Sequence, residues 1–200
     1  MEFGIFLQGH LPGPAAFDRA EEHAMSLREV EYAICADRNS WKYVWVSEHH
    51  ALAEYSHTSA SEVFMAYCAA RTSRVLVELY HDTFPHREGA PTWQEPPRAL
   101  PPELLDPLID GGMMLCGNPD EVVAQLKVCE RTGVDQVCFG VPMNLASDDA
   151  LELIETFGTQ VIPEFDQDPV HSTTHHRDKA VPKFPAFAAP PPDITTAYSS

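Results

Sequence analysis

Residues 41–50 read WKYVWVSEHH, a strand pattern that runs directly into three polar residues. The segment Tyr43–Ser47 is β-branched and aromatic, which is typical of a buried strand. Glu48, His49 and His50 follow at once. In parallel α/β folds the carboxyl ends of the strands form the edge that carries the functional side chains. These three residues are therefore candidate site residues.

Strand and helix signals alternate on both sides of this stretch. Apolar residues at spacings of three and four from Phe17 to Ile34 predict one buried face of a helix. Ser59 and Glu62 have the spacing of a capping box and predict a helix start. In chain order, the predicted elements are strand 2–7, helix 17–34, strand 43–47, helix 59–73, strand or helix 75–80, helix 118–133, strand 134–141 and helix 147–161. Strands that alternate with amphipathic helices predict a parallel sheet and an α/β fold.

The clearest helix boundary in the chain is the run Asn118-Pro119-Asp120-Glu121. Asn is a good cap, Pro suits the first helical position, and the two acids face the positive end of the helix dipole. Gly133 marks the expected end of this helix. The acidic pair is better explained by this helix start than by acid–base chemistry.

Proline content divides the chain. Residues 1–167 form the predicted α/β domain, with opening elements in 1–75, a proline-rich irregular connector in 76–112 and closing elements in 113–167. Residues 168–200 have no apolar period and are rich in proline and small polar residues. That composition predicts a disordered tail.

Charge and cysteine content limit the function classes. The formal net charge is −17, from 13 basic and 30 acidic residues. Phosphates and anionic lipids both need a basic surface, so neither nucleic acid nor a membrane is an expected partner. Neither a signal peptide nor an apolar run of the ~18–20 residues that span a membrane is visible. Five cysteines without a CxxC pair suggest reduced thiols and a cytoplasmic protein.

The histidines after Tyr43–Ser47 allow two interpretations. A histidine near its normal pKa serves as an acid or base at neutral pH, so one of the pair could face a substrate. Alternatively, both could cap the strand end and hydrogen-bond to the backbone. A metal site built from Glu48, His49, His50 and His57 is the weaker idea, because adjacent side chains on an extended chain diverge. No metal is therefore predicted.

Other reactive residues carry weaker signals. Cys116 lies just before a predicted helix start, where the dipole could stabilise a thiolate. The apolar residues before it favour a buried strand cysteine instead. His171, His175 and His176 lie in the low-complexity tail and predict no site.

Several motifs together resemble one family. They are MEFGIFLQGH at 1–10, WVSEHHALAEYSHTSASEVF at 45–64, CGNPDEV at 116–122, GVDQVCFGVP at 133–142 and IETFGTQVIPEFD at 154–166. In this order they resemble the luciferase-like flavin-dependent monooxygenases, a family of (β/α)8 barrels. The Glu-His-His run after the second strand is the most specific of these motifs.

The resemblance implies a set of functional residues and partners. His49 matches the active-site acid–base histidine, and Glu48 and His50 match its neighbours. Phe6, Leu7 and Gln8 would lie at the floor of the flavin pocket. The implied cofactor is reduced FMN, with the deazaflavin F420 as the alternative. The implied partners are O2, a small organic substrate, a separate flavin reductase and a second copy of the chain.

Chain length limits what the resemblance implies. A (β/α)8 barrel takes about 250 residues, whereas this chain has 200 and the predicted domain ends at 167. The expected fold is therefore a partial TIM barrel that retains the first and last βα units and lacks the middle strands, with the break near Val75 and Leu76. The expected function is a flavin-dependent monooxygenase, and the alternative is a non-catalytic truncated remnant or partner-binding subunit.

Overall fold

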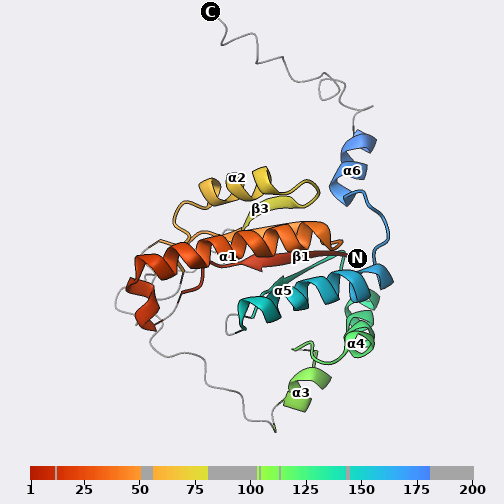
Figure 1. Ribbon diagram of the computed structural model, residues 1–200. Helices are drawn as coiled ribbons and strands as arrows, with labels where there is room; N and C mark the ends of the chain where they lie inside the picture. The colour runs from red at the N-terminus through yellow and green to blue at the C-terminus, as the bar shows by residue number, and fades with distance from the viewer. Residues whose placement is uncertain are drawn as a thin grey trace, which may run out of the picture. The chain divides into compact units, whose positions relative to one another are not determined.

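The computed structural model describes residues 1–11, 13–50, 56–80, 103, 105–112, 114–142 and 145–180 (Figure 1). The chain divides into two compact units, Met1–Gln167 and Asp168–Ser200. The elements of the first unit are β1 (Glu2–Leu7), the 3-10 turn Gly13–Phe17, α1 (Arg19–Arg38), β2 (Tyr43–Ser47), α2 (Ser61–Arg71), β3 (Leu76–Tyr80), α3 (Leu105–Asp110), α4 (Pro119–Arg131), β4 (Gln136–Gly140), α5 (Ser147–Thr156), the π-helical turn Phe157–Val161 and the 3-10 turn Ile162–Glu164.

The four strands form one parallel sheet in the order β3-β2-β1-β4. The predicted α/β class with parallel strands is therefore confirmed. The strands Glu2–Leu7 and Tyr43–Ser47 have the predicted bounds. Leu76–Tyr80 is a strand and pairs with β2, so the prediction that an irregular connector begins at residue 76 is wrong. Most of that connector, 81–102 and residue 104, lies outside the described residues.

The strand register separates the sheet into two unlike faces. Paired residues share a face, and one face is entirely apolar: Phe3, Ile5, Leu7, Val44, Val46, Val77, Val137 and Phe139. The other face is mixed: Glu2, Gly4, Phe6, Tyr43, Trp45, Ser47, Leu76, Glu78, Gln136, Cys138 and Gly140. Within the described ranges, the buried apolar cluster takes its strand residues from the first face alone.

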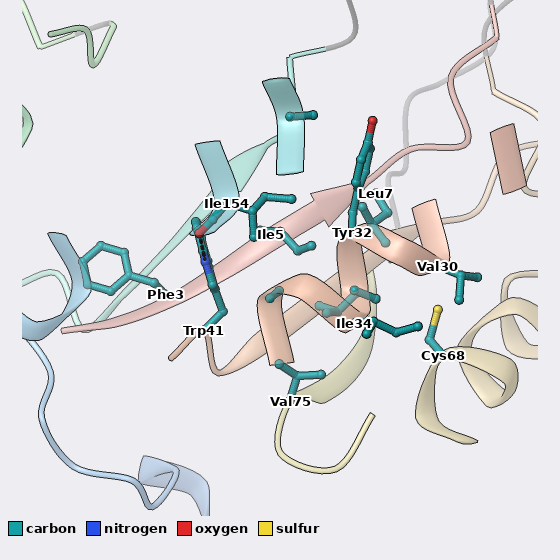
Figure 2. Close-up of a cluster of buried hydrophobic side chains, with 14 of the residues drawn as sticks. Phe3, Ile5, Leu7, Val30, Tyr32, Ile34, Trp41, Cys68, Val75 and Ile154 are labelled. Atoms are coloured by element: carbon teal, nitrogen blue, oxygen red, sulfur yellow. Dashed lines mark hydrogen bonds between the residues drawn. The ribbon is translucent and has the colours of Figure 1, made fainter. Parts of the chain in front are cut away.

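Helices cover the apolar face (Figure 2). Helix α1 packs against both α2 and α5. Val30 of α1, Cys68 of α2 and Ile154 of α5 all join the cluster around Phe3, Ile5 and Leu7. The ring of Trp41 stacks on Phe157, with 4.9 Å between centroids. Its Nε1 donates a 2.9 Å hydrogen bond to the carbonyl of Ile154, which fixes α5 against the start of β2.

The buried face of α1 differs from the predicted one. Phe17 is 73% exposed and Leu27 is 45% exposed, although both were expected in the core. Asp18 caps the helix by accepting a 2.8 Å hydrogen bond from the Ala20 amide, so Phe17 belongs to the preceding 3-10 turn. Val30 and Ile34 of the predicted face are buried, and the complete buried set of the helix is Met25, Glu29, Val30, Tyr32, Ala33, Ile34, Ala36 and Asp37.

Two of the predicted helix starts have different outcomes. Asn118 and Glu121 form the expected reciprocal capping box, with Pro119 in the first turn. The capping box expected at Ser59 does not form, because the Ser59 amide donates to His57 and the residue stays in the loop. Helix α2 begins at Ser61 with Ala60 as its cap.

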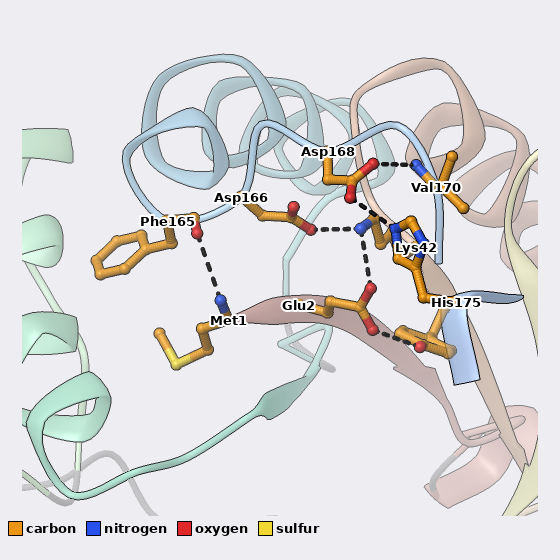
Figure 3. A network of polar contacts seen from close by, with 9 residues as sticks. Met1, Glu2, Lys42, Phe165, Asp166, Asp168, Val170 and His175 are labelled. Atoms are coloured by element: carbon orange, nitrogen blue, oxygen red, sulfur yellow. Dashed lines mark hydrogen bonds and ion pairs between the residues drawn. The ribbon is translucent and has the colours of Figure 1, made fainter. Parts of the chain in front are cut away.

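At the amino ends of the strands lies a buried polar network (Figure 3). Lys42 Nζ is 2.8 Å from Glu2 Oε1 and 2.8 Å from Asp166 Oδ2. The Tyr43 hydroxyl donates to the other oxygen of Glu2. The network ties β1 and β2 to the segment that follows α5, and it lies at the opposite edge of the sheet from the candidate site residues.

The second unit contains helix α6 (Ser172–Ala180). The prediction of a disordered tail is therefore wrong for these residues, and 181–200 lie outside the described part of the chain. Arg177 and Lys179 occupy the last turn, where they complement the helix dipole. His175 Nε2 lies 2.8 Å from Asp168 Oδ2, which links α6 to the residues before it.

Candidate functional site at the carboxyl edge of the sheet

The sequence-predicted site residues follow two neighbouring strands. Phe6 and Leu7 end β1, and Gln8 comes next. Glu48, His49 and His50 follow β2. Because β1 pairs with β2 in parallel, with Leu7 opposite Val46, both groups lie at the same edge of the sheet. The two candidate groups are therefore neighbours in the fold.

Main-chain hydrogen bonds join the loop after β1 to the loop after β2. The His57 amide donates a 2.9 Å bond to the carbonyl of Gly9. Within the loop after β2, the His49 amide donates a 3.0 Å bond to the carbonyl of Thr58. The Ser56 hydroxyl donates to the carbonyl of Gln8. Gly9 has a φ of +61°, and a Cβ there would lie 2.1 Å from the Thr58 hydroxyl oxygen. This close approach therefore requires glycine.

The three residues of the Glu-His-His run have different surroundings. Glu48 Oε2 accepts a hydrogen bond from the Ser61 hydroxyl at the start of α2. Glu48 Oε1 lies 3.0 Å from Nε2 of the exposed His50. His49 is half-buried. Glu48 thus holds its loop to α2, and its contact with His50 favours a supporting role for that histidine.

His57 belongs to the same edge and also contacts α1. Its Nδ1 lies 3.0 Å from Glu22 Oε1, and its side chain is largely buried. Among the described residues, no group of three or more His, Cys, Asp or Glu side chains could hold a metal ion.

A pocket of about 160 Å³ opens beside the end of β1. Its walls come from the end of β1, from one face of α1 and from the segment between β4 and α5. The lining residues are Phe6, Leu7, Gln8, His10, Met25, Arg28, Glu29, Tyr32, Val141, Pro142 and Leu145. The predicted cofactor-binding residues Phe6, Leu7 and Gln8 are among them, whereas Glu48, His49 and His50 are not.

Glu29 is a titratable pocket residue that the sequence interpretation missed. It is only 9% exposed, and its Oε1 accepts a 2.9 Å hydrogen bond from the Gly9 amide. Burial raises the pKa of Glu29 to about 7, although hydrogen bonds from loop amides oppose this shift. A carboxyl group that titrates near neutral pH beside a pocket is a candidate acid–base group. The available signal was its spacing of four from Met25 and Ala33 on one helix face.

The cysteines show no comparable arrangement. All five are free, and Cys116 is exposed in a loop, so the expectation of a buried strand cysteine is wrong. Gln125 holds this loop by bonding both the amide and the carbonyl of Cys116. Burial raises the pKa of Cys68 to about 12, with a further contribution from the charge of Glu29.

The fold and the site define an α/β protein with polar residues gathered at the carboxyl edge of a four-stranded parallel sheet. No family model matches the chain, and no curated protein matches it. None of the helices in the described ranges is long and apolar enough to cross a membrane.

Proposed function

We propose that the chain is a flavin-dependent oxidoreductase or monooxygenase of the luciferase-like type. Its cofactor is reduced FMN, with F420 as the alternative, and its substrates are O2 and a small organic molecule. A separate reductase supplies the reduced flavin, and a second copy of the chain is a partner. The observation that carries the proposal is the strand order β3-β2-β1-β4 with the helices gathered on one face.

This arrangement supports a partial (β/α)8 barrel. In a closed barrel the first strand lies between the second and the last, and the helices all lie outside. Here β1 lies between β2 and β4, and α2, α1 and α5 pack in succession on the apolar face. A doubly wound sheet with the same strand order would have helices on both faces. Under the proposal, β4 corresponds to the last strand of the barrel and the mixed face to its interior.

The pocket suits part of a flavin rather than a whole one. Its apolar walls with a few polar groups are typical of cofactor sites, but ligand pockets usually enclose about 300–1,000 Å³. The pocket here measures about 160 Å³. Arg28 is the one basic side chain other than histidine in its lining. The described residues therefore do not fit a complete FMN, and no reaction step through the flavin follows from them.

The chain's own residues have roles under this proposal. Phe6 and Leu7 supply an apolar floor at the end of β1, and Gln8 supplies a polar group beside it. His49 is the proposed acid–base residue, since the resemblance assigns it that role. Glu48 holds the loop of His49 through Ser61, and through its contact with His50.

Flavin titration of the purified chain tests the proposal. We expect the fluorescence of FMN to be quenched when it binds to the chain. We also expect bound reduced FMN to react with O2 more slowly than free reduced FMN, and an oxygenated product to form when the organic substrate is present. Replacing His49 with alanine should reduce turnover while leaving binding in place. The matched control is His23→Ala, on the exposed side of α1. No change in flavin signal at high micromolar FMN would contradict the proposal.

A second candidate function is a non-catalytic remnant or partner-binding subunit. The small pocket favours it, together with the edge strands β3 and β4, which each pair with a single strand in the described part of the chain. Unpaired parallel edges promote association with another chain. Light scattering combined with size exclusion distinguishes the two functions. A defined dimer that binds flavin supports the enzyme, whereas a species that binds no flavin supports the remnant.

A further inference from the structure

The carboxyl group of Glu29 reaches from the middle of α1 to the turn that follows β1. Its Oε1 accepts a 2.9 Å hydrogen bond from the Gly9 amide. The amides of Gln8 and His10 also interact with this carboxylate and favour its charged form. The turn after β1 therefore places its backbone amides beside one buried carboxylate, and the Gly9 amide donates the hydrogen bond.

The same turn supports the loop that carries His49. The carbonyl of Gly9 accepts a hydrogen bond from the His57 amide, and the carbonyl of Thr58 accepts one from the His49 amide. Helix α1 makes a second connection to this loop through Glu22, which lies 3.0 Å from Nδ1 of His57. Glu22 and Glu29 are seven residues apart, so they lie on the same face of the helix.

We propose that Glu29 is a positioning residue for the carboxyl edge of the sheet. Its ionised carboxylate fixes the turn Gln8–His10, and the main-chain bonds of that turn set the position of the His49 loop. Protonation of Glu29 weakens the first of these contacts, because a neutral carboxyl oxygen is a poorer acceptor than a charged one. The catalytic role of His49 rests on the proposed function. The connection between Glu29 and the two loops rests on the hydrogen bonds alone.

Several groups around Glu29 determine when it ionises. Burial, the largest effect, raises its pKa to about 7, and the loop amides and the charge of Arg28 lower it. The titratable and charged groups that face it are Arg28 and Tyr32 on α1, His10 in the β1 loop and Cys68 on α2. In the segment between β4 and α5, the described residues that line the pocket are apolar: Val141, Pro142 and Leu145.

NMR titration of the whole ligand-free chain tests the proposal. The side-chain carboxyl carbon of Glu29 and the amide of Gly9 should shift with one common midpoint near neutral pH. Part of the pH-dependent change in the chemical shifts of the His57 and His49 amides should have the same midpoint. The neighbouring histidine side chains also influence the shifts of these amides, so variants must separate their effect from that of Glu29.

Glu29→Gln is the informative variant, because glutamine has the same shape and keeps a neutral acceptor for the Gly9 amide. In this variant we expect the amide of Gly9 to lose its pH-dependent change in chemical shift. The amides of His57 and His49 should lose the part of their change that has the midpoint of Glu29. The control Glu31→Gln, on the exposed side of the same helix, should leave all of these shifts unchanged.

Two results would overturn the proposal. One is a Gly9 amide that does not respond while the Glu29 carboxyl titrates. The other is a His49 amide with the same titration in the wild type and in Glu29→Gln. Should the variant fail to fold, the wild-type titration alone decides, through the presence or absence of the shared midpoint. Because no flavin is added, the outcome is independent of whether the chain binds one.

Discussion

Lys42 Nζ lies 2.8 Å from Asp166 Oδ2, and both side chains are less than a tenth exposed. The same nitrogen is 2.8 Å from Glu2 Oε1 (Figure 3). Burial alone would lower the pKa of Lys42, but the hydrogen bonds and charges of Asp166 and Glu2 hold it above its usual value. The residue that precedes β2 therefore stays charged and holds two carboxylates that are far apart in the sequence.

Replacing Lys42 with methionine should destabilise the fold by about 3–5 kcal/mol, because two buried carboxylates lose their cation. Urea unfolding at neutral pH measures this loss. In the wild type, a raised lysine pKa gives stability that is present below about pH 10.4 and lost as the pH rises through the folded pKa. The exposed Lys179→Met should change stability by less than about 0.5 kcal/mol. Equal stabilities of the two variants would contradict the role of Lys42.

Asp37 fixes the start of β3 from the end of α1. Its carboxylate accepts hydrogen bonds from the amides of Ser73, Arg74 and Val75, at 3.1, 2.6 and 2.9 Å. Burial would raise its pKa, but the amides of Val75, Arg74 and Ser73 outweigh burial and lower it. The stability that Asp37 contributes is therefore present above about pH 4 and lost in stronger acid.

The substitution Asp37→Asn should cost about 1–3 kcal/mol at neutral pH, since the amide side chain is a weaker acceptor and leaves a buried donor without a bond. Hydrogen exchange at residues 73–75 should accelerate together with this loss. Asp135→Asn is the control, because Asp135 is exposed. Unchanged exchange at these three amides would show that the carboxylate does not hold the strand.

Glu29 has the opposite dependence on pH. Its pKa is raised from 4.5 to about 7 by burial, so folding favours its protonated form. The wild type should lose stability as the pH rises from about 4.5 to about 7, by roughly 3 kcal/mol at 1.36 kcal/mol for each pKa unit. Glu29→Gln should remove this slope and exceed the wild type in stability above pH 7. The prediction would be contradicted if the free energies of unfolding of the two proteins had the same dependence on pH. The control Glu31→Gln should behave as the wild type.

Gly158 lies where the π-helical turn after α5 meets the end of α1. A Cβ at this position would be 1.9 Å from the carbonyl oxygen of Asn39. Gly158→Ala should therefore destabilise the fold by about 3 kcal/mol, as the two helices must separate. Gly140→Ala is the matched control, because nothing lies within 4 Å of a Cβ there. Thermal unfolding compares the two variants, and equal midpoints would contradict the close approach.

Sequence patterns predicted β1 and β2 with their observed bounds, because each is short, apolar and followed by polar residues. The buried face of α1 was not predictable in the same way. Glu29 and Asp37 lie on that face, and each is held by backbone amides of a distant segment, at residue 9 and at residues 73–75. A pattern that counts only apolar residues places such carboxylates in solvent.

The candidate site was likewise predictable in part. Parallel pairing of β1 and β2 was enough to bring Gln8 and Glu48 to one edge. The pocket required more, because one of its walls comes from Val141, Pro142 and Leu145, beyond β4. That wall is in place because β4 pairs with β1, a contact between residues more than 130 positions apart. No local signal in the sequence specifies that pairing.

At the carboxyl edge the His57 amide joins the two loops, and the His49 amide closes its own loop onto Thr58. Any residue other than proline supplies the same amide, so the main-chain hydrogen bonds survive a change of side chain at these two positions, whereas the contact of His57 with Glu22 does not. The main chain therefore holds this edge at His49 whatever the side chain, and the edge should tolerate replacement of His49 with the fold retained. Such a surface is a favourable starting point for selecting new activities, whether or not the present one depends on flavin.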